Sequence, residues 1–218
     1  MELTQVQTIA VWILPIIFAV TVHEVAHGYV ACLLGDKTAK ILGRLTLNPI
    51  KHIDPIGTII LPAVLLLLNT GIILGWAKPV PINPYNFANY RRDSALVALA
   101  GPMANLLMVI AWASIAKISS LLLIGGLLEV QAIYLMGMAG VSINLMLMVL
   151  NLLPIPPLDG SHIVASLLPP RIATHYNNVS SFGFIILIFL IYFGVINFIA
   201  SPIISFLYSF VCKIFSLS

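Results

Sequence analysis

The sequence predicts an all-α polytopic membrane protein with about five to six transmembrane helices, a membrane-dipping hairpin and a possible short β element near residues 38–48. Composition is the first reason. Of the 218 residues, 61% are hydrophobic and only 8% are charged, whereas roughly 25% of the residues of a soluble domain are charged. The second reason is that the apolar residues gather in runs of about 18 residues or more, the length that a helix needs to cross a bilayer.

Five apolar runs are candidate spans, at residues 6–34, 56–75, 94–116, 121–153 and 180–214. We expect the helix of the fourth run to begin near residue 128, after a pair of glycines. We expect the fifth run to divide into two helices, over about 180–197 and 201–214, because Pro202 and nearby polar residues interrupt it.

The β element is expected within residues 38–48, where apolar and polar residues alternate loosely between Ile41 and Leu47. We expect a single membrane-embedded domain over residues 1–218. Its core, which would hold the functional residues, covers about 6–162, and further helices follow over about 180–214.

Charge and cysteine content exclude several classes of protein. The net charge of +3 is small and spread along loops, so we interpret it as a determinant of membrane topology and expect no nucleic-acid binding. Cys32 and Cys212 are isolated in apolar surroundings and predict no disulfide framework. The N-terminus lacks the positive region of a signal peptide, so we expect the first apolar run to be retained.

Ionisable residues stand inside that first run, in the order His23-Glu24-Val25-Ala26-His27. Such groups are costly within a bilayer and are usually functional. In a helix, residues i and i+4 share one face, so the two imidazoles could bind one Zn²⁺ ion while the adjacent glutamate reaches a water molecule. The alternative is a histidine pair that is hydrogen-bonded within a helix bundle, and the burial of the motif disfavours it.

A catalytic zinc ion needs a third protein ligand and keeps one position for water. Asp159 is the leading candidate, in the segment NLLPIPPLDGSH (151–162) that ends a long apolar run. Its prolines forbid a continued helix, and such irregular backbone at membrane depth needs protein or water around it. The alternative is a loop aspartate at the membrane surface. Two histidines and a carboxylate would also accept other divalent ions.

Together, the two motifs resemble the site-2 protease family (peptidase M50-like) of intramembrane zinc metalloproteases. The stretches GRLTLNPIKHIDPIGT (43–58), GWAKPVPINP (75–84) and AGPMAN (100–105) resemble its compact bacterial members, which lack PDZ and CBS domains. The resemblance covers about residues 20–162. It implies one Zn²⁺ ion per chain, held by His23, His27 and Asp159, with Glu24 as general base and Asn151 holding or polarising the scissile carbonyl.

Several polar residues have open roles. His52 and Asp54 match the family pattern and either pack the structure or assist the site. His162 either supports Asp159 or is a loop histidine. We expect Asn105 to hydrogen-bond between helices rather than to take part in the chemistry.

The positions of the two metal motifs constrain the topology. Both lie toward the C-terminal ends of their helices, so these helices must run in the same direction and an odd number of crossings must separate them. Two apolar runs lie between them, so one of the two does not cross. The run 56–75, which Pro62 and the sequence LNTG interrupt, is expected to be a hairpin beside the active site.

A count of basic residues agrees with the hairpin. If the run 56–75 spans the membrane, the ten Lys and Arg residues divide five against five; with a hairpin, only Lys117 is opposite the other nine. Those nine are Lys37, Lys40, Arg44, Lys51, Lys78, Arg91, Arg92, Arg171 and Lys213. The positive-inside rule then predicts an external N-terminus and an active site toward the cytoplasmic face of the cell membrane.

The sequence thus predicts an enzyme that hydrolyses peptide bonds in or near transmembrane segments of membrane proteins within the lipid bilayer. A helical substrate must unwind locally to expose a carbonyl, and an edge such as 38–48 could receive it as an added strand. The alternative is a divalent-metal transporter or a metal-binding membrane protein without hydrolytic activity, although such a protein has no need of Glu24. A silent scaffold is disfavoured by the intact set of four residues.

Overall fold

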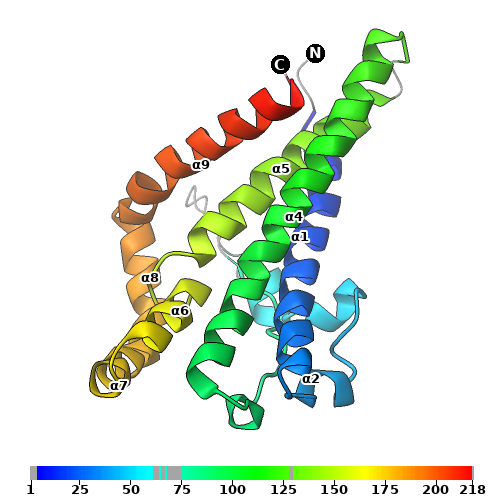
Figure 1. Ribbon diagram of the computed structural model, residues 1–218. Coiled ribbons are helices and arrows are strands. Elements are labelled where there is room, and N and C mark those ends of the chain that lie inside the picture. Colours follow the sequence, from blue (N-terminus) through cyan, green and yellow to red (C-terminus); the bar gives the residue numbers. More distant parts are fainter. Residues whose placement is uncertain (1–3, 61–63, 65–66, 68–74, 128–129, 218) are drawn as a thin grey trace.

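The protein is built from helices, as Figure 1 shows for its computed structural model. The structure describes residues 4–60, 64, 67, 75–127 and 130–217, and all regular elements among them are helical. Four helices are long and apolar enough to cross a membrane, namely α1 (Gln5–Leu33), α4 (Tyr90–Ile124), α5 (Gln131–Asn151) and α9 (Val195–Phe215). The predicted all-α polytopic class is therefore confirmed, and the chain is a multi-pass membrane protein.

The predicted count of five to six spans is not confirmed in the described part of the chain. Helix α8 (Gly183–Tyr192) is apolar but has only 10 residues. At 1.5 Å per residue it is about half as long as the hydrocarbon core of a bilayer, which is roughly 30 Å thick.

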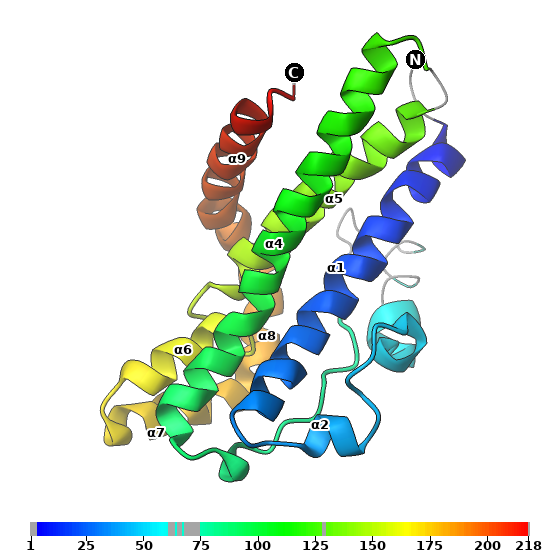
Figure 2. The same cartoon turned by 45° about the vertical axis from the view of Figure 1, so that its right-hand side comes forward.

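Helices α1, α4 and α5 pack against one another (Figures 1 and 2), with α4 running opposite to the other two. The glycines of α5 allow a close approach to α4. A Cβ atom on Gly137 would lie 2.8 Å from Cβ of Ala116, and one on Gly140 would lie 2.3 Å from the ring of Trp112. Small residues commonly bring membrane helices together in this way. Among the described residues between α1 and α5, α4 is the one helix long enough to cross a membrane. The parallel course of α1 and α5 agrees with the predicted relation between the two metal motifs.

The hairpin predicted for residues 56–75 lies largely outside the described residues. Its described ends, however, lie side by side. Helix η2 (Pro55–Ile60) carries Gly57, whose carbonyl accepts a hydrogen bond from Trp76 N–H at 3.1 Å, and Thr58 Oγ1 donates to Trp76 O at 2.8 Å. The chain therefore returns at Trp76 to the place that it left at Thr58.

The β element expected at 38–48 is not confirmed. Residues Thr38–Ile41 form helix α2, and a turn at Gly43 with φ of 63° leads through irregular backbone to helix η1 (Pro49–His52). The side chain of Asp36 accepts hydrogen bonds from N–H and Oγ1–H of Thr38, which favours a helical turn at that point. The suggestion that this segment offers a strand edge to a substrate therefore loses its basis.

The division expected at Pro202 is wrong. The chain bends instead at Gly194, whose φ of 73° is a conformation that favours glycine, and Pro202 lies inside α9. Membrane helices tolerate such prolines. Because α9 is one continuous helix, its C-terminal end lies beside Lys117, which donates from Nζ to Ser216 O at 3.2 Å. Lys213 therefore lies at the same end of the bundle as Lys117. The remaining eight of the ten Lys and Arg residues belong to or adjoin α2, η1, the start of α4 and the helix that begins at Pro170, at the opposite end (Figure 1).

Shorter helices follow α5 on the side of the eight basic residues. They are α6 (Asp159–Leu167), α7 (Pro170–Val179) and η5 (Ser180–Phe182), and helix η3 (Pro84–Asn86) precedes α4. The side chain of Arg91, at the start of α4, donates to Ser166 O and Leu168 O and so ties α6 to the bundle. This tie fixes the helix that begins with Asp159.

Candidate metal centre

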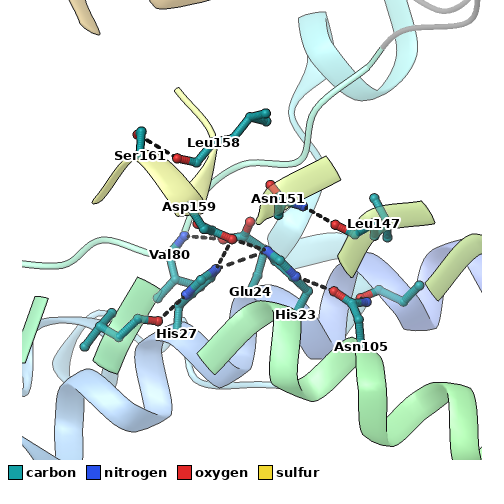
Figure 3. Close-up of polar contacts among 12 residues, drawn as sticks. His23, Glu24, His27, Val80, Asn105, Leu147, Asn151, Leu158, Asp159 and Ser161 are labelled. Carbon is teal, nitrogen blue, oxygen red and sulfur yellow. Dashed lines mark hydrogen bonds and ion pairs between the residues drawn. The ribbon is translucent and has the colours of Figure 1, made fainter. Parts of the chain in front are cut away.

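Three side chains from two separate helices converge in the bundle (Figure 3). The Nε2 atoms of His23 and His27 lie 3.1 Å apart, and Asp159 Oδ2 lies 3.2 Å from the first and 3.3 Å from the second. Both histidines are buried, and the carboxylate is 18% exposed. The three atoms form a nearly equilateral triangle.

The dimensions and chemistry of this triangle fit a zinc ion. Ligand atoms that bind one tetrahedral zinc at about 2.0–2.1 Å lie about 3.3–3.4 Å from one another. Asp159 Oδ2 is buried and has no hydrogen-bond partner, as expected of an atom that serves as a metal ligand.

Partners outside the triangle fix both imidazole rings. His23 Nδ1 donates to Asn105 Oδ1 at 2.6 Å, and His27 Nδ1 donates to the carbonyl of Val97 at 2.7 Å. Both acceptors belong to α4. Because the Nδ1 atoms carry the protons, the Nε2 lone pairs are free to face the triangle, an arrangement that is usual for histidine metal ligands.

Local sequence explains how each ligand reaches this place. His23 and His27 are four residues apart in α1 and therefore lie on one face. Asp159 is the first residue of α6, and the turn before it brings α6 against the end of α5. A Cβ atom on Gly160 would lie 2.4 Å from Leu152 O, so only glycine allows this approach.

Gly101, which was not among the predicted site residues, brings α4 against the site. A Cβ atom there would lie 2.4 Å from His27 Nε2 and 2.5 Å from His23 Cε1. A glycine beside a proline within a long apolar run was the available signal. The expectation for Asn105 is confirmed, since it joins α1 to α5 by contacts with His23 and Asn144.

Glu24 lies next to the triangle, on α1 between the two histidines. Its Oε2 atom accepts a hydrogen bond from Val80 N–H at 2.9 Å. Asn151, at the last turn of α5, donates from Nδ2 to Leu147 O of its own helix at 3.0 Å. Figure 3 shows Asn151 on the α5 side of the site, near the three converging residues.

Of the remaining polar candidates, His52 and Asp54 have structural contacts. His52 is buried and pairs through Nε2 with Thr46 O at 2.9 Å. Asp54 Oδ1 accepts hydrogen bonds from the N–H groups of Ile56 and Gly57 and so begins helix η2. His162 is exposed on α6, one turn beyond Asp159.

A paired-histidine helix with an adjacent glutamate, completed by an aspartate from a second helix inside a membrane bundle, defines the class of membrane zinc metalloproteases. Similarity to known proteins shows the same class. The pattern of "Peptidase family M50" matches residues 109–191. A relative named "Putative zinc metalloprotease YwhC", from Bacillus subtilis (strain 168), is 40% identical over 183 residues, which cover 82% of this chain and 78% of the relative. The chain belongs to peptidase family M50 and is a zinc metalloprotease of the site-2 protease type.

Two mycobacterial relatives carry the name "Putative zinc metalloprotease Rip2". The one from Mycolicibacterium smegmatis is 28% identical over 195 residues, covering 87% of this chain and 68% of the relative. The one from Mycobacterium tuberculosis (strain H37Rv) is 34% identical over 159 residues, covering 71% and 54% respectively. No solved structure matches the chain.

Proposed function

We propose that this metalloprotease cleaves peptide bonds in or near transmembrane segments of other membrane proteins, with His23, His27 and Asp159 as the ligands of one Zn²⁺ ion. The observation that carries the proposal is the triangle of Nε2, Nε2 and Oδ2 atoms with edges of 3.1–3.3 Å, buried between helices that each belong to a membrane bundle. We further propose that residues 1–218 act as one membrane-embedded protease domain.

Glu24 is the general base in this proposal. A bound zinc ion supplies Lewis acidity, which activates a water molecule and polarises the substrate carbonyl. Glu24 accepts the proton of the attacking water and gives it to the leaving amine. Its position on α1, between His23 and His27 in the sequence, supports this role. A metal transporter has no use for such a base, and neither the family nor its relatives favour transport.

The substrate must present an extended backbone at this site. In a transmembrane helix every carbonyl is already hydrogen-bonded, so the helix has to unwind before a carbonyl can approach. In the proposal Asn151, at the edge of the site, then donates to the substrate carbonyl, after it releases Leu147 O.

The active site faces the cytoplasm in our proposal. Eight of the ten Lys and Arg residues lie on the side of α2, η1 and α7, and only Lys117 and Lys213 lie on the other. The positive-inside rule assigns the side with more basic residues to the cytoplasm.

Cleavage of a transmembrane model substrate by purified protein in detergent or proteoliposomes tests the proposal. We expect wild-type protein to cleave and Glu24→Gln to bind zinc without cleaving, because only the proton acceptor is lost. Glu129→Gln, the same change in a residue that lies between α4 and α5 in the sequence, is the matched control and should cleave normally. Cleavage by zinc-loaded Glu24→Gln at the wild-type rate would exclude the general-base role.

A further inference from the structure

We propose that Val80 and Gly28 are positioning residues for the catalytic glutamate: Gly28 provides a notch that seats the Val80 side chain, and the Val80 amide then holds the Glu24 carboxylate. The inference rests on the proposed role of Glu24 as general base. It assigns a function to the segment 76–86, which contributes no side chain to the metal triangle.

The contact between Val80 and Glu24 is short and enclosed. The Val80 N–H donates to Oε2 at 2.9 Å, and the Val80 residue is 5% exposed. A hydrogen bond from an amide to an ionised carboxylate is roughly twice as strong as one between neutral groups. It fixes one carboxylate oxygen, so the other is the one available to a water molecule.

Gly28 determines where Val80 sits. It lies one helical turn after Glu24 on α1, and a Cβ atom there would lie 2.7 Å from Val80 Cγ1 and 3.0 Å from Leu45 Cδ2. Leucine has a flexible side chain, whereas the branched valine has no equivalent freedom. A side chain at position 28 must therefore displace Val80, and with it the amide that contacts Glu24.

Hydrogen bonds on both sides of Val80 hold the extended segment in place. Before it, Lys78 N–H donates to His52 O at 2.9 Å, and Arg44 Nη2 donates to Lys78 O at 3.0 Å and to Pro79 O at 3.2 Å. His52, which is buried, thus supports the segment through its backbone carbonyl.

After Val80, the carboxylate of Asp36 binds the segment. Asp36 is fully buried and accepts hydrogen bonds from Asn83 N–H and Asn86 Nδ2, both at 2.7 Å. Burial raises the pKa of Asp36. The hydrogen bonds from Thr38, Asn83 and Asn86 together lower the pKa by more than burial raises it, so the net pKa lies below the ordinary value and the carboxylate stays charged. The segment is thus fixed to α1 at Glu24, at Gly28 and beyond the helix end.

A fixed carboxylate matters because general-base catalysis depends on geometry. A displacement of about 1 Å of a catalytic group can cost about 10²-fold in rate. Gly28→Ala should therefore lower kcat by about 10- to 100-fold, with zinc content retained and KM changed less than about threefold. A general loss of folding would instead lower zinc content and the fraction of active protein.

A second substitution that restores kcat distinguishes a positioning role of Gly28 and Val80 from general damage to the fold. Val80→Ala removes Cγ1, the nearest neighbour at 2.7 Å. In the double variant Gly28→Ala/Val80→Ala the new methyl group then meets Leu45 Cδ2 at 3.0 Å and Ala39 Cβ at 3.3 Å, which need to move by only a few tenths of an ångström, so the segment can return. We expect the double variant to recover most of the kcat that Gly28→Ala loses. A second pair does not depend on Gly28: Val80→Pro, which lacks the N–H, should have a kcat at least about tenfold below that of Val80→Ala, which keeps it. Wild-type kcat in Gly28→Ala, or additive losses in the double variant, would overturn the proposal.

Amide hydrogen exchange tests the contact without any activity. Measured by mass spectrometry over residues 76–86, exchange should be faster in Glu24→Ala and in Gly28→Ala than in wild type, and slower again in the double variant. If wild-type protein cleaves no substrate but shows this exchange pattern, the proposed function fails and the contact stands. If wild type cleaves and Glu24→Ala exchanges at the wild-type rate, the contact does not exist in solution and the inference fails.

Discussion

His23 Nδ1 lies 2.6 Å from Asn105 Oδ1, so α4 orients an imidazole that α1 supplies. The amide nitrogen of Asn105 in turn donates to Asn144 Oδ1 at 2.8 Å, and Asn144 Nδ2 donates to Gly140 O at 2.8 Å. Side chains of three helices thus form one buried chain of hydrogen bonds. Rotation of the His23 ring would leave an amide unpaired in apolar surroundings, which is costly.

We therefore predict that Asn105→Ala weakens zinc binding by about 10- to 100-fold, the usual effect of removing the partner of a ligand histidine. Asn144→Ala, which removes only the partner of Asn105, should have a smaller effect. Competition with a chromophoric chelator measures both affinities. An Asn105→Ala protein that binds zinc as tightly as wild type would show that the ring needs no such support.

Gly101→Ala should also reduce zinc binding, for a steric reason. The added Cβ atom would lie 2.4 Å from His27 Nε2, a ligand atom, so either α4 or the imidazole must move. Gly137→Ala is the matched control, because its Cβ atom would crowd Ala116 at 2.8 Å between α4 and α5. We expect both variants to lower the melting temperature and only Gly101→Ala to lower zinc affinity at a temperature where both are folded. Equal zinc affinities would refute the steric account.

The residues that converge on the site could be predicted because their signals are local. A helix places His23 and His27 on one face whatever surrounds it, and the prolines before Asp159 end α5 in any context. The requirement that two helices run parallel then predicted that α4 crosses in the direction opposite to α1 and α5, as it does in the described part of the chain. Gly101 and Val80 escaped prediction because their roles depend on which segment lies against α1, and that is a property of the packed bundle.

Two predictions, the β element at 38–48 and the helix break at Pro202, were wrong because a neighbouring contact or the bilayer environment outweighed the local sequence preference. Residues 38–48 have a loosely alternating pattern, but the Asp36 side chain and the turn at Gly43 favour a short helix. Pro202 was expected to break the last run, yet a helix within a bilayer has no water to replace its lost hydrogen bonds and continues past the proline. The break falls at Gly194, where the backbone turns without strain.

Asn151 is predicted to act on the substrate rather than on the metal. Removing one donor to a developing oxyanion typically costs about 10²–10³ in kcat, and we expect Asn151→Ala to lose that much while it keeps zinc and its fold. Its present acceptor, Leu147 O, belongs to its own helix, so the loss of that bond should change stability little. A loss of kcat below about threefold would mean that Asn151 has only a structural role at the end of α5.

The last prediction concerns membrane topology, namely the side of the membrane on which the two ends of the segment 56–75 and the end of α9 lie. Gly57 and Trp76 are hydrogen-bonded to each other, so residues before and after the segment should lie on one side of the membrane. Ile50 and Tyr85 are 72% and 91% exposed. In a background without Cys32 and Cys212, we expect Ile50→Cys and Tyr85→Cys to react with an impermeant thiol reagent from the cytoplasmic side.

Lys213→Cys should react only from the opposite side, because α9 crosses once and ends beside Lys117. The three variants keep the excess of basic residues on one side, so the labelling does not itself disturb the orientation. Reaction of Ile50→Cys and Tyr85→Cys from opposite sides would mean that the segment 56–75 crosses the membrane, and α1 and α5 could then not run in the same direction. If Lys213→Cys instead reacted from the same side as Tyr85→Cys, the chain would cross the membrane twice after α7, as the sequence had predicted. The account of how Asp159 meets His23 and His27 would survive that second result but not the first.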